Sequence, residues 1–304
     1  MEQNDKPRLT GVHFLLTYTC SYECDHCFLY CSPQSVGTFT FNQVKDVLKE
    51  CGEIGTITRI YFEGGEPFLF YPLLLKGVRT AVEAGFKVGI VTNCYWATSP
   101  PDAEIWLKPL IDAGLTDISL SDDSFHAGSE ENLSPKYAAE AAETLELDAG
   151  IICINPPELN NDRGGNRGEP IVGGGTRFKG RAADKLTDGL PVKPTGTFNS
   201  CDEEDFHNPG RVHVDAFGNV QICQGLSIGN MWETPLSQLM SRYEPQSHPI
   251  CGCLSRGGPV LLAKEYNVNL DGEFVDVCHY CFNVRRALID RFPEYLTPRP
   301  VYGL

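Results

Sequence analysis

Three cysteines near the start of the chain have the spacing of a metal-binding loop. Cys20, Cys24 and Cys27 form a C-x3-C-x2-C run directly after an apolar segment. Three thiolates this close in sequence can surround one metal centre, and soft sulfur ligands select zinc, copper(I) or iron–sulfur clusters. A cubane cluster held by three cysteines has one iron open to an exogenous ligand. On spacing alone the alternative is a zinc site, with His26 or a distant residue as fourth ligand.

The composition guides how these cysteines are interpreted. The chain has 304 residues, of which 13 are cysteines, and a formal net charge of −15. The N-terminus has no apolar core of a signal peptide, and no apolar run is long enough to span a bilayer. We therefore expect a cytoplasmic protein, whose reduced cysteines are metal ligands before they are disulfides. The acidity disfavours binding to a nucleic-acid backbone, which requires Lys and Arg.

Short apolar segments alternate with helical segments from residue 11 to about 155, which is typical of a parallel sheet with helices outside it, open or barrel-like. The predicted strands are Val12–Leu16, Arg59–Phe62, Phe86–Val91, Asp117–Leu120 and Ile151–Ile154. Thr40 and Gln43 predict a capping box. Ser99 before Pro100 and Ser134 before Pro135 predict two more helix starts, and Gly85 and Gly114 predict helix ends.

The second half of the chain has a different character. Asn155–Gly175 is rich in glycine and proline, so we predict a loop there, with a short strand at Pro170–Val172. Arg211–Val214 and Val220–Cys223 flank a glycine-containing turn, which predicts a β-hairpin. We place a domain boundary in the segment 185–196.

Several motifs appear in a consistent order along the first 185 residues. They are Cys20–Cys27, Gly64-Gly65-Glu66-Pro67 after the second strand, Val91-Thr92-Asn93 at the end of the third, Ile118–Asp123 over the fourth, and Gly180-Arg181-Ala182. Together they resemble the radical S-adenosylmethionine (radical SAM) superfamily: its cysteine signature, its GGEP and TN motifs, its serine/aspartate strand and its GRA element. The conjunction is far more specific than any single motif.

The resemblance implies an α/β fold, a partial TIM-like (β/α)6 barrel over residues 1–190. It also implies a [4Fe-4S] cluster on Cys20, Cys24 and Cys27, with S-adenosylmethionine (SAM) on the open iron. Reductive cleavage of SAM would give a 5′-deoxyadenosyl radical that abstracts hydrogen from the substrate. The motifs follow strand ends, where parallel barrels place active sites. The residues expected to contact SAM are His26, Gly64, Gly65, Glu66, Asn93, Ser119 and Ser121, although ordinary strand hydrogen bonding explains Ser119 and Ser121 nearly as well.

A second group of cysteines occurs downstream. Cys201, Cys223, Cys278 and Cys281 resemble the auxiliary-cluster domain of the SPASM/Twitch subfamily, in its half-sized, single-cluster form. The resemblance implies a small β-hairpin/helix domain over residues 191–304, with a second [4Fe-4S] cluster. A structural zinc held by the same four cysteines is the alternative. Cys251 and Cys253 form a C-x-C pair in a Pro/Gly-rich segment, and we assign them as non-ligands.

The substrate is less defined by the sequence. Cys94, as a hydrogen-atom donor, and Asp123 and His126, as bases, are weaker catalytic candidates beside the expected barrel rim. An auxiliary cluster that relays an electron favours a net oxidation, a cross-link or an epimerisation, of a small molecule or a peptide. Flavodoxin or ferredoxin would supply the reducing electron. The alternative function is a zinc-binding or electron-carrier protein without SAM chemistry, and it leaves the Gly64–Pro67 motif unexplained.

Overall fold

The computed structural model describes residues 9–127, 132–160 and 171–304. Eight strands form one sheet in the order β10-β9-β8-β1-β2-β3-β4-β5. Its strands are β1 (Gly11–Thr17), β2 (Arg59–Gly64), β3 (Lys87–Thr92), β4 (Asp117–Ser121), β5 (Asp148–Ile152), β8 (Arg211–Asp215), β9 (Asn219–Cys223) and β10 (Leu226–Asn230). Strands β1 to β5 pair in parallel, which confirms the predicted parallel sheet.

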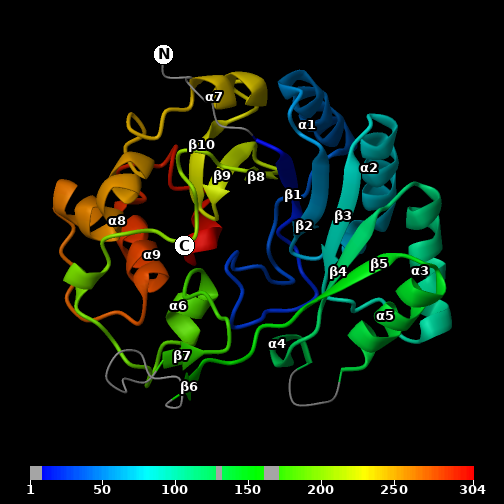
Figure 1. The fold of residues 1–304 in the computed structure, drawn as a ribbon, viewed down its shortest axis with the longest axis horizontal. Helices are drawn as coiled ribbons and strands as arrows, with labels where there is room; N and C mark the ends of the chain where they lie inside the picture. The colour runs from blue at the N-terminus through cyan, green and yellow to red at the C-terminus, as the bar shows by residue number, and fades with distance from the viewer. Residues whose placement is uncertain (1–8, 128–131, 161–170) are drawn as a thin grey trace.

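Helices cover the outer face of this curved sheet (Figure 1). They are α1 (Phe41–Ile54), α2 (Tyr71–Glu83), α3 (Pro100–Asp112) and α5 (Ser134–Thr144), whereas the short α4 (Ser124–Ala127) lies at the end of β4. The C-terminal part adds α6 (Arg181–Lys185), α7 (Leu236–Arg242), α8 (Cys251–Glu265) and α9 (Val277–Leu288). Three short 3-10 helices span Pro67–Phe70, Thr195–Thr197 and Arg299–Tyr302. None of the described helices is long and apolar enough to cross a membrane.

Local signals explain most element boundaries. Thr40 and Gln43 form the predicted capping box of α1, and the Ser99 side chain accepts from Asp102 N at the start of α3. A helix does start at Ser134, as predicted, but Ser134 is the first residue of α5 and not its cap, and its own backbone N–H donates to Asn132 Oδ1. The fifth strand begins at Asp148 and ends at Ile152, so it lies nearer the N-terminus than predicted.

The predicted hairpin is present but joins the main sheet. Strand β8 pairs in parallel with β1, with His13 opposite His213, and β9 and β10 continue the sheet in antiparallel fashion. The carboxylate of Asp215 shapes the turn by accepting from Phe217 N and Asn219 N. Strands from both sides of the expected boundary thus share one sheet, and the division at residue 190 stays a prediction. Strand β10 was not predicted.

The glycine-rich stretch after β5 forms a small sheet of its own among the described residues, from β6 (Glu158–Asn160) and β7 (Ile171–Gly173). Strand β7 overlaps the predicted strand, whereas residues 161–170 lie outside the described part of the chain.

The two faces of the central strands have different roles. Val12, Phe14 and Leu16 on β1 belong to the large apolar core that includes α1 residues such as Val44. Because side chains alternate along a strand, His13 and Leu15 point to the opposite, interior face. Leu15 packs there in a second cluster with Cys20 and Cys31 of the loop after β1. The interior of the sheet therefore supports the cysteine loop.

Candidate active site and auxiliary cysteine site

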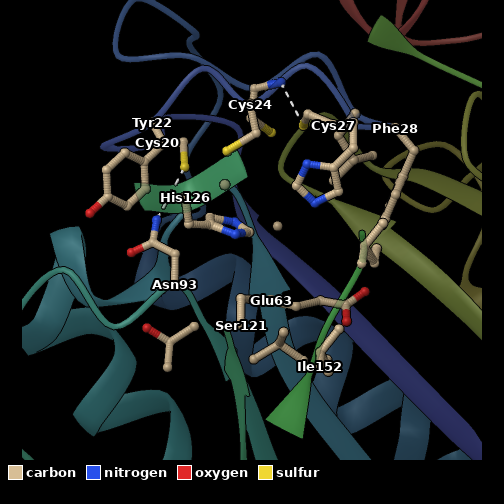
Figure 2. Close-up of a pocket in the computed structure, with 18 of the residues that line it drawn as sticks. Cys20, Tyr22, Cys24, Cys27, Phe28, Glu63, Asn93, Ser121, His126 and Ile152 are labelled. Atoms are coloured by element: carbon tan, nitrogen blue, oxygen red, sulfur yellow. Dashed lines mark hydrogen bonds between the residues drawn. The ribbon is translucent and has the colours of Figure 1, made fainter. Parts of the chain in front are cut away.

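A cavity of about 210 Å³ lies at the carboxyl ends of β1 to β5. Its lining includes all three signature cysteines and four of the residues expected to contact SAM besides His26. The latter are Gly64, Gly65, Asn93 and Ser121. Figure 2 shows Cys20, Cys24 and Cys27 at one end of the cavity, with Glu63 and Ile152 toward the other. Residues far apart in sequence thus converge on one hollow, as the barrel-rim argument predicts.

The cysteine loop is held from outside by the Gly180-Arg181 pair. Arg181 is buried and donates from Nη1 to the Cys24 carbonyl oxygen at 2.7 Å and from Nη2 to the Cys31 carbonyl oxygen at 2.8 Å. Its backbone N–H donates to the Cys27 carbonyl oxygen at 2.9 Å. Gly180 has a φ of +60°, and a Cβ there would lie 2.5 Å from the Phe28 backbone. The GRA element therefore fixes the backbone that presents the thiols.

Gly64 and Gly65 allow β2 to contact the chain leading into the cysteine loop. A Cβ on Gly65 would lie 2.2 Å from the Thr19 carbonyl oxygen, and one on Gly64 would lie 2.5 Å from that of Thr17. Gly65 N in turn donates to the Thr17 carbonyl oxygen at 2.7 Å. The sequence predicted close approach of these glycines to a ligand; in the described structure their closest neighbours are backbone atoms. A larger residue at either position would displace the loop that carries Cys20.

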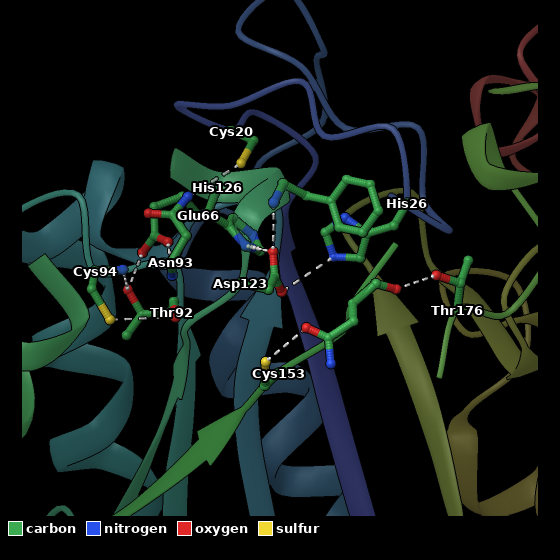
Figure 3. Close-up of polar contacts among 12 residues, drawn as sticks. Cys20, His26, Glu66, Thr92, Asn93, Cys94, Asp123, His126, Cys153 and Thr176 are labelled. Atoms are coloured by element: carbon green, nitrogen blue, oxygen red, sulfur yellow. Dashed lines mark hydrogen bonds and ion pairs between the residues drawn. The ribbon is translucent and has the colours of Figure 1, made fainter. Parts of the chain in front are cut away.

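Glu66 lies beneath the cavity rather than in its lining. It is fully buried and accepts hydrogen bonds from Phe68 N, Thr92 Oγ1 and Asn93 N at 2.8 to 3.0 Å. Figure 3 shows Glu66 beside Thr92 and Asn93. Burial raises the pKa of Glu66 to about 7, although these three donors favour its ionised form. Glu66 thus ties the end of β2 to the end of β3, and direct contact with SAM stays a prediction.

Asn93 and the two serines are placed differently from one another. Asn93 Nδ2 donates to Ser21 Oγ at 3.0 Å and to Cys20 Sγ at 3.5 Å, so this side chain orients the first cysteine. Ser121 lines the cavity, whereas Ser119 lines a separate hollow near the start of the strands, with Asp117 and Asp148. Both serines share a face of β4, but Ser119 lies one repeat nearer the strand's beginning. The structure therefore does not bring Ser119 to the expected site.

His26, Asp123 and His126 form a compact polar cluster at the cavity. The His26 ring stacks on Phe125 with centroids 4.6 Å apart, and Asp123 Oδ1 contacts His126 Nδ1 at 2.8 Å. Burial lowers the pKa of His26 to about 4 despite the nearby Asp123 carboxylate, so the ring is neutral at pH 7. Asp123 Oδ2 and His26 Nδ1 are buried without a hydrogen-bond partner in the described structure. These two atoms are free to contact a bound group.

Cys94, the other catalytic candidate, is not among the residues that line the cavity. It is fully buried, has a φ of +63°, and its thiol faces the Thr92 carbonyl oxygen at 3.7 Å. Its surroundings are those of a core residue, so we do not propose it as a hydrogen-atom donor.

The thiols of the loop are suited to metal binding. Burial raises the pKa of Cys20 to about 11 and raises that of Cys24 further. Contact with the Cys31 thiol, together with backbone amides and Arg181, lowers the pKa of Cys27 to about 6. Buried thiols of this kind become thiolates when a metal cation supplies the compensating charge. The donor set therefore fits a soft metal centre.

The downstream cysteines meet at a second, much smaller hollow of about 20 Å³. Its lining includes all four predicted ligands: Cys201, Cys223, Cys278 and Cys281. Cys223 ends β9, and the last two lie one turn apart on α9, so a strand, a helix and a loop each contribute. Cys251 and Cys253 are buried in α8 and do not line this hollow. The four-cysteine assignment is therefore geometrically consistent.

Two buried cations accompany these cysteines. Lys179 Nζ lies 3.7 Å from Cys223 Sγ and donates to Gln224 Oε1 at 2.6 Å. Arg285 lines the same hollow and donates to the Gln224 carbonyl oxygen at 3.1 Å, while its Nε has no hydrogen-bond partner. Buried charges are costly unless paired. Both cations are consistent with a site that carries net negative charge, as four thiolates around a cluster would.

Comparison with known proteins identifies a domain in the first half of the chain. Residues 14–154 match the family model of the Radical SAM superfamily. The chain contains a radical SAM domain. Enzymes of this superfamily use a [4Fe-4S] cluster together with SAM, and the residues at the first cavity fit that pair: three adjacent thiols, a stacked neutral imidazole and two buried polar atoms without partners.

The chain is also similar to two known proteins, YydG and BtrN. The chain is 23% identical over 195 residues to the "Putative peptide biosynthesis protein YydG" of Bacillus subtilis (strain 168), a match that covers 63% of this chain and 61% of YydG. The chain thus matches less than two thirds of that relative's length. Its fold is similar to that of BtrN crystallised with AdoMet and 2-DOIA: TM-score 0.52, 17% identity, covering 82% of this chain and 88% of BtrN. BtrN in an open conformation gives a TM-score of 0.48 at 15% identity, covering 82% and 86%.

Several residues at these sites were not predicted from the sequence. Glu63 lines the first cavity, and Lys179 and Arg285 line the second. The GRA element was recognised, but the hydrogen bonds of Arg181 to the cysteine loop were not. A buried arginine or lysine gives no local sequence signal. Only its position in the sequence, outside any amphipathic helix or strand pattern, could have suggested a role.

Proposed function

We propose that this protein is a radical SAM enzyme that modifies a peptide, with Cys20, Cys24 and Cys27 as ligands of the SAM cluster and a second [4Fe-4S] cluster on the downstream cysteines. One observation carries the proposal: each of the two cysteine sets converges on its own cavity. The downstream set is Cys201, Cys223, Cys278 and Cys281. The match to the radical SAM superfamily weighs against a zinc-binding or electron-carrier protein without SAM chemistry.

When bound, the cluster and SAM supply a 5′-deoxyadenosyl radical that abstracts a hydrogen atom. The chain's own residues bind and orient these groups. Arg181 and Gly65 fix the loop backbone, and Asn93 orients the Cys20 thiol. His26, stacked on Phe125, offers a flat neutral face for the adenine. Four cysteine ligands leave the second cluster no open iron, which favours electron relay over substrate binding.

A peptide is the favoured substrate class because YydG, the curated relative, is described as a peptide biosynthesis protein. The net charge of −15 adds an electrostatic attraction for basic segments. The competing substrate class is a small molecule, toward which the fold similarity to BtrN points. Net oxidation or cross-linking would remove two hydrogen atoms from the peptide, whereas epimerisation would exchange one. The electron donor expected is a flavodoxin or ferredoxin.

The cluster assignment is tested by anaerobic reconstitution and counting of iron and sulfide. We expect about eight irons per chain and 5′-deoxyadenosine after reduction with SAM. Cys24→Ala should retain about four irons and lose 5′-deoxyadenosine. Cys281→Ala should also retain about four irons but keep 5′-deoxyadenosine. Cys251→Ala is the matched control and should keep the wild-type iron content. No iron in the wild type would refute the proposal.

The substrate class is tested by the rate of 5′-deoxyadenosine formation with basic peptides or with sugars and other small alcohols. Acceleration by peptides is expected. Mass spectrometry in D₂O then separates a loss of two hydrogens from an uptake of one deuterium. Acceleration by the alcohols alone would overturn the peptide assignment and leave the cluster assignment standing.

A further inference from the structure

Two histidines and a glutamate meet in the interior of the sheet, at the end of the first cavity away from the cysteines. His13 lies on β1, Glu63 on β2 and His213 on β8. His13 is the register partner of His213, and Glu63 is the partner of Leu15, two residues further along β1. Side-chain alternation therefore puts all three on the same interior face. Glu63 also lines the first cavity, as Figure 2 shows.

The distances in this cluster are those between ligands of one metal ion. His13 Nδ1 lies 3.2 Å from Glu63 Oε2, and His213 Nε2 lies 3.2 Å from Glu63 Oε1. One ligand atom from each residue falls within 4.8 Å of the others. Ligands bound at 2.0 to 2.1 Å in a tetrahedral arrangement are roughly 3.3 Å apart. His13 Nδ1 is nevertheless buried with no hydrogen-bond partner, so its contact with Glu63 is close without being a hydrogen bond.

The surroundings of His213 indicate that a cation belongs between it and Glu63. Lys179 donates to Gln224 Oε1, which turns the Gln224 amide nitrogen toward His213 Nε2 at 3.5 Å. An amide NH₂ only donates, so His213 Nε2 presents its lone pair. That lone pair lies 3.2 Å from a carboxylate oxygen of Glu63. Two electron-rich atoms this close need a positive charge between them, which a metal ion or a proton can supply.

We propose that His13, Glu63 and His213 bind a divalent first-row transition-metal ion, distinct from both cysteine sites. Two imidazoles and one carboxylate suit ions such as Zn²⁺ or Fe²⁺ rather than Mg²⁺ or Ca²⁺. Three protein ligands leave at least one coordination position open. Because Glu63 lines the first cavity, that position faces the space where substrate would lie, and it would hold a substrate oxygen or nitrogen. Only this last role rests on the proposed function; the metal site does not.

The second polar cluster, of His26, Asp123 and His126, is the internal comparison. It also places three ligand atoms within 4.8 Å of one another. Its Asp123–His126 contact, however, is a regular hydrogen bond of 2.8 Å, so a proton already accounts for the geometry. His26 Nε2 lies 3.9 Å from Asp123 Oδ2, which is longer than either contact of the first cluster. We therefore assign the metal site to the first cluster.

Zinc binding to the reconstituted chain of 304 residues tests the assignment. Protein with both cysteine sites loaded with iron is equilibrated with Zn²⁺, separated by gel filtration, and analysed for zinc and iron. We expect one zinc per wild-type chain at unchanged iron content. Glu63→Gln and His213→Ala should each weaken zinc binding by at least tenfold, the scale of a lost ligand or of its orienting partner. Asp123→Asn is the matched control from the other cluster and should bind zinc as the wild type does.

X-ray absorption at the zinc edge decides the site even where a variant fails to fold. The wild type should show only nitrogen and oxygen ligands at about 2.0–2.1 Å. A sulfur shell at about 2.3 Å, or iron lost as zinc is gained, would place the zinc on the cysteines and overturn the proposal. Equal zinc binding in wild type and Glu63→Gln would also overturn it. No zinc in the wild type would likewise overturn it. The iron count and 5′-deoxyadenosine are read separately, so failure here leaves the radical SAM assignment intact.

Discussion

The Arg181 side chain donates a 2.7 Å hydrogen bond to the carbonyl oxygen of Cys24, a residue 157 positions earlier in the chain. A second bond of 2.8 Å reaches the Cys31 carbonyl oxygen, so one planar guanidinium spans two points of the cysteine loop. Both acceptors belong to backbone that has little regular structure of its own. The loop geometry is therefore set by a residue that does not ligate metal.

Arg181→Lys should weaken the N-terminal cluster. A lysine keeps the charge but cannot bond both carbonyls with a rigid fork. A buried acceptor left without its partner costs about 1–3 kcal/mol. We expect iron to be lost faster to a chelator and 5′-deoxyadenosine formation to fall, while about four irons stay on the downstream cysteines. Arg299→Lys, at a half-exposed arginine paired with Asp290, is the control. Equal rates of iron loss would contradict this role.

Glu66→Gln should remove a pH dependence of stability. Burial raises the pKa of Glu66 from 4.5 to about 7 in the folded chain. Between these values the unfolded chain binds fewer protons than the folded one, so wild-type stability should fall as the pH rises through this window. The glutamine does not titrate and should lack this slope. Melting temperatures of the two holoproteins across the window measure it, with exposed Glu83→Gln as control. Parallel curves for wild type and Glu66→Gln would refute the raised pKa.

The sequence predicted those parts of the fold that local physics determines. Four of the five predicted strands are placed within a residue or two, because each is a short, buried, β-branched run between turn signals. The Thr40 capping box is confirmed because both of its partners lie within one turn. Ser134 starts its helix as predicted but does not cap it, since its own backbone N–H donates to Asn132 Oδ1. Ser119 is not at the predicted site, because the alternation of side chains shows which face of a strand a residue lies on but not how far along the strand it lies.

The parts that could not be predicted depend on tertiary pairing. His13, Glu63 and His213 become neighbours only because β8 adds to the edge of the sheet beside β1. Each of the three, taken alone, is an ordinary polar residue in an apolar strand. The need for glycine at position 180 likewise appears only in the folded chain, where the Phe28 backbone packs against this positive-φ residue. The first cysteine set was predictable because its spacing itself carries the chemistry, whereas the downstream set was predicted from the resemblance to the SPASM/Twitch subfamily.

Cys94→Ala should leave activity unchanged. The thiol is fully buried, faces the Thr92 carbonyl oxygen, and lies outside the lining of the first cavity. Removing a small buried group costs about 1 kcal/mol of stability, which a lowered melting temperature would show. Formation of 5′-deoxyadenosine and deuterium uptake by product in D₂O should match the wild type. Loss of deuterium uptake with normal 5′-deoxyadenosine would instead make Cys94 a hydrogen-atom donor.

Lys179→Gln should lower the reduction potential of the downstream cluster. Lys179 is buried 3.7 Å from Cys223 Sγ, and its charge favours the more negative, reduced form of a cluster held there. If that interaction is worth about 1.4 kcal/mol, the potential should fall by about 59 mV, since the couple transfers one electron. A redox titration followed by electron paramagnetic resonance measures the shift. Lys185→Gln removes an exposed lysine of α6 and controls for overall charge.

A cluster that accepts the substrate electron less readily should then slow product formation more than 5′-deoxyadenosine formation. Equal slowing of both would place Lys179 outside the electron relay and leave it a structural partner of Gln224.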